Sequence, residues 1–272
     1  MFDFVKFLAT GEMTPREQEL ATNLTIMYVM AILGMAMLYR LLRPPRTVDI
    51  NPEPSGKQLH ADSSVPSTEA TLSLIRSRRS VFPKDLSGEE LTRDEVETLL
   101  EAANWAPTHA RSEPWRYTVV QGGAGVNGFL DLVEEWYSQH MEEVPAQEYH
   151  HYTKKIAGCK NLWPGRVSHL IIIGMARQTL EDRRLPEWEE ICACASSVQN
   201  LQLAMTSLRG VGGYWCSLTW ARRFRDGAAM REFCGLGDEE DRVLGCLVLG
   251  RVQPGKTFRG NRGDIRDKVM WK

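Results

Sequence analysis

The alternation of apolar and polar residues separates a long charge-free run near the start of the chain from a region of mixed periodicities after about residue 68. Beyond that point, apolar residues recur three and four apart in some segments, as in helices with one buried face. In others they form short continuous runs, as in strands covered on both faces. The pattern predicts, in order, helices at 68–76 and from 92 onward, a strand at 116–120, a helix at 126–141, a strand at 169–174, a helix at 187–209, and strands at 214–215 and 243–250. Thr92 is placed as an N-cap with Glu95 three residues later, the spacing of a capping box. Helices outnumber strands, so we expect a small sheet wrapped by helices, an α+β or α/β sandwich.

The charge-free run covers residues 20–39, about the 20 residues that a helix needs to cross a bilayer core. Arg40, Arg43 and Arg46 follow it, whereas Lys6 and Arg16 are the bases before it. By the positive-inside rule this charge distribution predicts a single-pass transmembrane helix at 20–42, with the chain after it on the cytoplasmic side. A signal peptide is a weaker interpretation because an amphipathic, partly acidic segment (1–19) precedes the run. A buried core helix is weaker too, because a linker follows.

Prolines, serines and isolated charges dominate residues 43–67, which predicts an extended tether before a domain at 68–272. The formal net charge of −2 gives no reason to expect a nucleic-acid partner. Six cysteines are too few for a disulfide scaffold in 272 residues, so we expect buried, reduced thiols, which suits the cytosol.

Three short segments carry candidate chemistry. Arg78, Arg79 and Ser80 close the first helix of the domain. Arginines at an exposed helix end are usually solvated and compensate the helix dipole. The functional alternative is a phosphate site, because guanidinium groups bind phosphoryl oxygens in pairs and a serine hydroxyl adds a donor.

The second segment, residues 106–115, reads Ala-Pro-Thr-His-Ala-Arg-Ser-Glu-Pro-Trp and follows the second helix. A lone histidine such as His109 is more often structural than catalytic, and Trp115 at the start of a strand is normally core.

The third segment, Gly210-Val-Gly-Gly-Tyr-Trp215, lies between a helix and a strand, so it does not meet the dinucleotide fingerprint. A helix C-cap and turn explains part of it; glycine also allows close approach to a flat ring. No metal site is expected, because His140, His150 and His151 lack a convincing partner ligand.

Taken together, the three segments resemble the flavin site of the nitroreductase family in order and spacing, from about Leu72 to the C-terminus. The closing strand, 247–250 followed by Arg251, and the tail at 262–271 extend the resemblance. It implies a nitroreductase-like three-layer sandwich and a homodimer with FMN at the subunit interface. The layout of anchor, tether and flavin domain is similar to that of iodotyrosine deiodinase in the same superfamily.

The resemblance also implies roles for individual residues. Arg78, Arg79 and Ser80 would hold the ribityl-phosphate and ring edge, while Trp105 and His109, or Thr108, would approach from the other subunit. Gly213, Trp215, Cys216 and Ser217 would lie along the ring, with Ser217 or backbone amides reaching N5, and Arg251 would make a second phosphate contact. NADH or NADPH would reduce the flavin, which would then reduce a nitro-, quinone- or halo-aromatic acceptor in a ping-pong cycle. Aromatic residues at 136–164 favour an aromatic acceptor.

Two alternatives remain open. A hydroxyl donor at N5 favours a dehalogenase-like enzyme that uses one-electron steps, and Ser217 supplies such a hydroxyl. The second is a flavin-binding or membrane-tethered module without turnover. Phe82 favours it, because many family members carry a further arginine at that position.

Overall fold

The computed structural model describes residues 65–180 and 183–272. The predicted transmembrane helix and nearly all of the predicted tether lie outside these residues and stay predictions. Among the residues that are described, no helix combines the length and apolar character needed to span a bilayer.

Seven α-helices and six strands are found in the described residues. The helices are α3 (Thr68–Ser77), α4 (Arg93–Asn104), α5 (Gly122–Gln139), α6 (Ala146–Leu162), α7 (Glu187–Ser207), α8 (Arg222–Asp226) and α9 (Ala228–Phe233). The strands are β1 (Trp115–Gln121), β2 (His169–Met175), β3 (Thr179–Leu180), β4 (Arg183–Arg184), β5 (Val211–Cys216) and β6 (Arg242–Arg251). The predicted helices and strands of the domain are confirmed, with ends that differ by a few residues.

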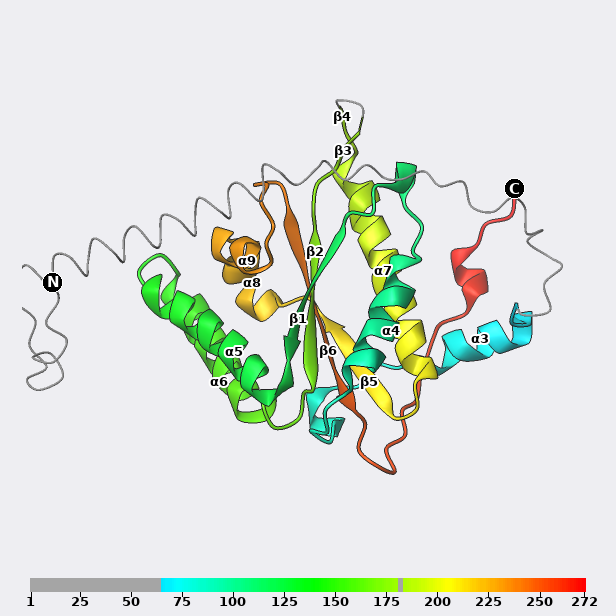
Figure 1. Cartoon of the computed structure of the whole chain (residues 1–272), viewed down its shortest axis with the longest axis horizontal. Helices are drawn as coiled ribbons and strands as arrows, with labels where there is room; N and C mark the ends of the chain where they lie inside the picture. Colours follow the sequence, from blue (N-terminus) through cyan, green and yellow to red (C-terminus); the bar gives the residue numbers. More distant parts are fainter. Residues whose placement is uncertain (1–64, 181–182) are drawn as a thin grey trace, which may run out of the picture. The chain divides into compact units, whose positions relative to one another are not determined.

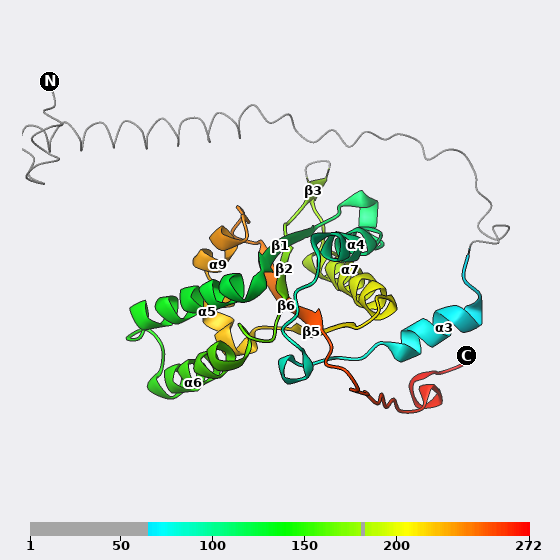
Figure 2. The same ribbon diagram turned by 60° about the horizontal axis from the view of Figure 1, so that its bottom comes forward.

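A four-stranded antiparallel sheet in the order β1-β2-β6-β5 forms the middle layer. All seven residues of β2 are buried, as its continuous apolar run predicted. Figure 1 shows α5, α6, α8 and α9 on one face of the sheet and α4 and α7 on the other, and Figure 2 shows the same layering after rotation. Each face has its own apolar core. The expected small sheet between helical layers is therefore confirmed.

Local sequence signals account for the helix starts. At α4 the Thr92 hydroxyl accepts from the Glu95 amide at 3.3 Å, and the Glu95 carboxylate accepts from the Thr92 amide at 2.9 Å. The capping box is thus formed as predicted. At α3 the Ser67 hydroxyl accepts from the Ala70 amide at 3.2 Å.

The sequence pattern predicted no helix between residues 141 and 169, yet α6 begins at Ala146. This helix has a weak apolar pattern and buries only Tyr152 and Ile156. Polar contacts hold α6 in place. Arg223 of α8 donates two hydrogen bonds to Glu148, at 3.1 Å each, and Glu148 also accepts from the Tyr152 hydroxyl. A tertiary ion pair therefore holds a helix that periodicity alone does not reveal.

The C-terminal segment leaves β6 and runs on the same side of the sheet as α3, as both ribbon views show. It contains a single 3₁₀ turn at Ile265–Lys268. Gly260 lies against Arg79: a Cβ placed on this glycine would be 2.5 Å from the central guanidinium carbon. A side chain at this position would therefore displace the Arg79 guanidinium.

Candidate functional site

A cavity of about 580 Å³, here called the arginine cavity, opens where α3, α7, β5 and the C-terminal segment meet. Its lining is mostly polar, with two large apolar side chains. The residues are Ile75, Arg76, Arg78, Arg79, Ser80, Gln199, Gln202, Trp215, Gly260, Asn261 and Arg262. Of the predicted cofactor residues, Arg78, Arg79, Ser80 and Trp215 are therefore brought together in one place.

The arginine cavity carries positive charge that the described residues do not neutralise. None of Arg76, Arg78, Arg79 and Arg262 forms an ion pair with a carboxylate in the described part of the chain. Burial and the neighbouring Arg262 and Arg79 lower the pKa of Arg78. Because guanidinium groups at close quarters repel one another, this arrangement favours a bound anion.

The hydrogen bonds of Arg79 show more specifically that the cavity suits an acceptor. One terminal nitrogen donates to the carbonyls of Arg76 and Arg78, at 2.5 and 2.8 Å. Its Nε is buried and has no hydrogen-bond partner. A buried donor without a partner costs about 1–3 kcal/mol, so an acceptor in the cavity would remove that cost.

Two glycines of β5 hold the Arg78–Ser80 segment in place. The Val81 amide donates to the Gly213 carbonyl at 3.0 Å, which lays this segment along the edge of β5. A Cβ on Gly212 would be 2.6 Å from Val252 and 2.9 Å from Val81, and one on Gly213 would be 2.3 Å from the Val248 carbonyl oxygen. The absence of a side chain at Gly213 therefore serves the packing of β5 on β6, and its place along a flavin ring stays a prediction.

Side chains on β5 alternate between the two faces of the sheet. Trp215 faces the cavity, is 36% exposed, and donates from its indole nitrogen to the Leu244 carbonyl at 3.1 Å. The Cys216 side chain is buried in the core on the α5–α6 side, opposite Cys246 in the strand register. Contact with Cys216 and complete burial raise the pKa of the Cys246 thiol. Only the backbone of Cys216 can therefore meet a ligand on the α7 side.

Ser217 lies just beyond the end of β5 and does not line the arginine cavity. Its carbonyl accepts from Arg225 at 2.7 Å, and the next residue, Leu218, has a left-handed φ of 53°. Its contact with flavin N5 stays a prediction.

A second concavity, here called the histidine pocket, has a volume of about 400 Å³ and lies between the 106–112 loop and the start of α7. Its lining residues are Pro107, Thr108, His109, Trp188, Glu189, Cys192, Ala193 and Ser196. His109 Nδ1 lies 2.5 Å from Glu189 Oε2. Trp105 is not in this lining; it is 72% exposed and donates to Glu101 at 2.9 Å.

The loop that carries His109 has a strained backbone. Ala110, Arg111 and Glu113 have φ values of 49°, 55° and 40°. Left-handed φ costs a non-glycine residue about 1–2 kcal/mol. Strain of this kind concentrates at functional sites, and in the described residues the other non-glycine case is Leu218, beside Ser217.

The structure gives Arg251 a carboxylate partner within the chain, and its predicted phosphate contact stays a prediction. Its guanidinium pairs with Glu95 at 2.8 Å and is not part of the arginine cavity. The ion pair ties the end of β6 to the first turn of α4, so this arginine is already neutralised. Its position at the end of the closing strand could not reveal that partner.

Lining residues of the two concavities that were not predicted include Gln199, Gln202, Arg262, Trp188 and Glu189. Four of them lie on α7, where spacings of three and four from Trp188 through Cys192, Ser196 and Gln199 mark one face. That face is polar and aromatic rather than apolar, which is the signal that could have identified it.

Comparison with known proteins agrees with this architecture. The nitroreductase family model matches residues 75–251. The Escherichia coli (strain K12) protein named NAD(P)H nitroreductase YdjA is 27% identical over 182 residues, covering 67% of this chain and 88% of that protein. A Haemophilus influenzae protein with the same enzyme name is 26% identical, covering 66% and 86%.

Solved structures share the fold. The nitroreductase-like protein of Bacillus cereus superposes with a TM-score of 0.54 at 23% identity, over 78% of this chain and 99% of that one. A nitroreductase from Desulfovibrio desulfuricans in complex with FMN gives a TM-score of 0.52 at 17% identity, over 76% and 98%. Because the family model matches residues 75–251, which include all four strands of the main sheet, the chain belongs to the nitroreductase family.

Proposed function

We propose that this chain is an FMN-dependent oxidoreductase that transfers hydride from NADH or NADPH to a nitro-, quinone- or halo-aromatic acceptor in a ping-pong cycle. The observation that carries the proposal is the arginine cavity, where guanidinium groups that pair with no carboxylate of the described residues lie beside an indole face. An anionic, aromatic cofactor matches that combination. The names of the bacterial relatives and the FMN complex of the D. desulfuricans protein support the same assignment.

The residues present suit FMN. Arg78, Arg79 and Arg262 would hold its phosphate, with the unpartnered Arg79 Nε as one donor. Gln202, which accepts from Arg78 at 3.3 Å, keeps that guanidinium directed into the cavity, and Trp215 offers an aromatic surface. FMN supplies the capacity to take hydride from a nicotinamide and pass it on, which no protein side chain has.

We further propose a homodimer in which Thr108, His109 and Trp105 of one copy approach the FMN of the other. Within one copy, the histidine pocket and the arginine cavity are separate concavities on the same face of α7. That face exposes Trp188 (65%) and Ile191 (38%), and Trp105 is exposed nearby. Light scattering on the purified full chain should give twice the chain mass, and a monomer with bound FMN would contradict this arrangement.

The membrane anchor at 20–42 remains part of the proposal, with the catalytic domain facing the cytoplasm. The supporting observations are the charge-free run and the arginines after it. The full chain expressed in cells should stay in the membrane pellet after alkaline carbonate extraction. Its release into the supernatant would refute the anchor without affecting the enzyme assignment.

An absorbance spectrum of the purified full chain tests the function directly. We expect flavin bands that bleach when NADH or NADPH is added without oxygen, and that return when a quinone is added. Parallel double-reciprocal plots at several donor concentrations would support the ping-pong cycle. Protein that stays colourless after added FMN would refute flavin binding. Yellow protein that neither NADH nor NADPH bleaches would instead indicate a module without turnover.

A further inference from the structure

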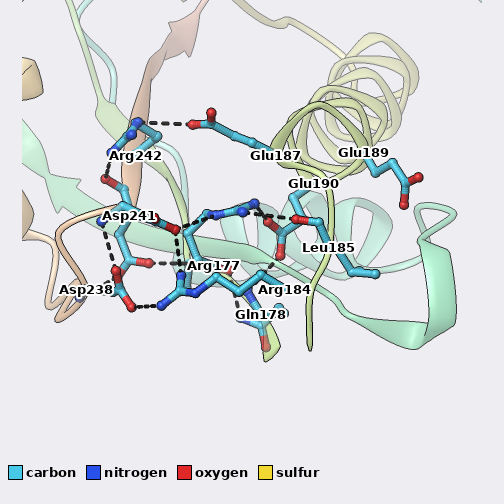
Figure 3. Close-up of polar contacts among 12 residues, drawn as sticks. Arg177, Gln178, Arg184, Leu185, Glu187, Glu189, Glu190, Asp238, Asp241 and Arg242 are labelled. Carbon is cyan, nitrogen blue, oxygen red and sulfur yellow. Dashed lines mark hydrogen bonds and ion pairs between the residues drawn. The ribbon is translucent and has the colours of Figure 1, made fainter. Parts of the chain in front are cut away.

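The first turn of α7 presents three glutamates in three directions, as Figure 3 shows. Glu187 pairs with Arg242 at 3.1 Å, and Glu190 pairs with Arg177. Glu189 points away from that network, toward His109 of the histidine pocket. Two of the three glutamates therefore hold the fold together, and the third contacts a candidate site residue.

The buried contact fixes the direction of the exposed one. The Glu190 side chain is fully buried and accepts from the Gln178 amide at 2.7 Å as well as from Arg177. Arg177 in turn donates to the Leu185 carbonyl at 3.0 Å, just before the helix begins. Because this network holds the helix start on both sides, the Glu189 carboxylate is held against the imidazole of His109.

Glu189 determines which atom of His109 faces outward. A carboxylate can only accept, so His109 Nδ1 carries the proton in their 2.5 Å contact. The opposite ring nitrogen, Nε2, lies on the side of the ring away from Glu189. A proton that Nε2 takes up from water makes the imidazolium, which the carboxylate orients and stabilises, and this is the proton that Nε2 can donate to a ligand. The His109 side chain is 52% exposed, so it can exchange protons with water.

The histidine pocket and the arginine cavity adjoin along α7. Ser196 lines the former and Gln199 the latter, and residues three apart on a helix lie on one face at a rise of about 4.5 Å. In the proposed homodimer, where His109 of one copy approaches the FMN of the other, a flat ligand held between Trp188 and the 106–112 loop would lie close to that FMN.

We propose that the histidine pocket binds the oxidised acceptor and that His109 protonates it, with Glu189 as the positioning residue. This proposal rests on the proposed function, because the hydride comes from NADH or NADPH through FMN. For a quinone, the hydride forms the new bond to the acceptor and the cofactor is oxidised. The Nε2–H bond of His109 breaks as its proton goes to the second oxygen, and water then returns a proton to His109. The acceptor thus gains two electrons and two protons.

Two acceptors separate proton transfer from electron transfer. A quinone needs protons, whereas ferricyanide takes electrons one at a time and needs none. The NADPH- or NADH-reduced full chain is mixed with each acceptor in a stopped-flow instrument, and cofactor reoxidation is followed by absorbance. The variants are His109→Gln, His109→Ala and Glu189→Gln. Glu187→Gln is the control, because it removes the same charge from the same helical turn without facing His109.

We expect His109→Gln to slow quinone reduction about 100-fold or more, the range of general acid catalysis, with KM within threefold because glutamine keeps a donor. Ferricyanide reduction should change less than twofold. Glu189→Gln should slow quinone reduction about tenfold, and Glu187→Gln should leave both rates unchanged. As a readout independent of turnover, binding of hydroxybenzoate, monitored by the flavin spectrum, should weaken about fivefold in His109→Ala and be retained in His109→Gln.

Equal slowing of both acceptors in His109→Gln would overturn the proposal, since it would place His109 in cofactor binding or electron transfer. Unchanged quinone reduction would overturn it as well. A wild-type chain that reduces neither acceptor would instead refute the proposed function, so the two failures are distinguishable.

Discussion

The buried ion pair between Arg177 and Glu190 should be among the most costly contacts to break in this domain. The Glu190 side chain is fully buried and Arg177 is 8% exposed. Replacing Glu190 with alanine leaves the buried Arg177 with the exposed Glu240, 3.5 Å away, as its remaining carboxylate partner in the described residues, and the Gln178 amide also loses its acceptor. Removing one partner of a buried pair costs about 3–5 kcal/mol of unfolding free energy. In a domain of this size that corresponds to a fall in Tm of about 6–20 °C.

The same reasoning predicts that removing both charges costs far less. Arg177→Met combined with Glu190→Leu replaces the pair by apolar side chains of similar volume, which should stay within about 2 kcal/mol of the wild type. The exposed pair of Arg184 and Asp238 is a matched control, because Asp238→Asn should cost less than about 1 kcal/mol.

Thermal unfolding of the full chain, followed by circular dichroism, measures all three effects. A Glu190→Ala variant that melts within 3 °C of the wild type would refute the reasoning. The reasoning would also be refuted if the double variant of Arg177 and Glu190 were less stable than Glu190→Ala. That result would mean that the two charges stabilise the fold by more than neutralising each other.

Three further predictions follow from individual contacts. Arg79→Met should weaken FMN binding about 10- to 150-fold, the worth of a charge-assisted hydrogen bond, in a fluorescence titration, whereas Arg93→Met on the far side of α4 should not. Thr92→Ala should lower the unfolding free energy by about 1 kcal/mol in a denaturant titration, because the capping box of α4 is lost. Hydrogen bonds from Arg223 and Tyr152 hold the pKa of Glu148 at about 2, below its unfolded value, so this contribution is present at neutral pH and is lost as pH falls from about 4.5 towards 2. Glu148→Gln should therefore flatten the acid side of the stability profile, and an unchanged profile would contradict the assignment.

Periodicity and capping were enough to locate the sheet and the long helices. The continuous apolar run of β2 and the Thr92–Glu95 spacing both have local causes, so they could be predicted. α6 could not, because the contacts that hold it, from Arg223 to Glu148, join residues 75 positions apart. Ion pairing of this kind leaves no periodic trace in the sequence.

The site shows the same division. Arg78, Arg79 and Ser80 were predicted from a short motif and do line one cavity, but the motif could not show that Arg262 arrives from the C-terminal segment. Nor could it show the ion pair of Arg251, whose partner, Glu95, is 156 positions away and is also the capping residue of α4. A family resemblance predicts which residue types occur and in what order along the chain. Only the folded structure shows which of the charged side chains already form ion pairs.

Pairing also separates structural from functional arginines here. Arg177, Arg223 and Arg251 each meet a carboxylate, and each ties one element of the fold to another. The guanidinium groups of the arginine cavity have no such partner in the described residues, and Arg79 keeps a buried donor unused. Because an unpaired buried donor and clustered like charges both lower stability, the fold would carry them only where a ligand offsets the cost. The same logic applies to the left-handed residues around His109 and after Ser217. Unused hydrogen-bonding capacity in the arginine cavity and backbone strain beside the histidine pocket thus mark two concavities that share the exposed face of α7, which is the physical argument for treating them as parts of one functional site.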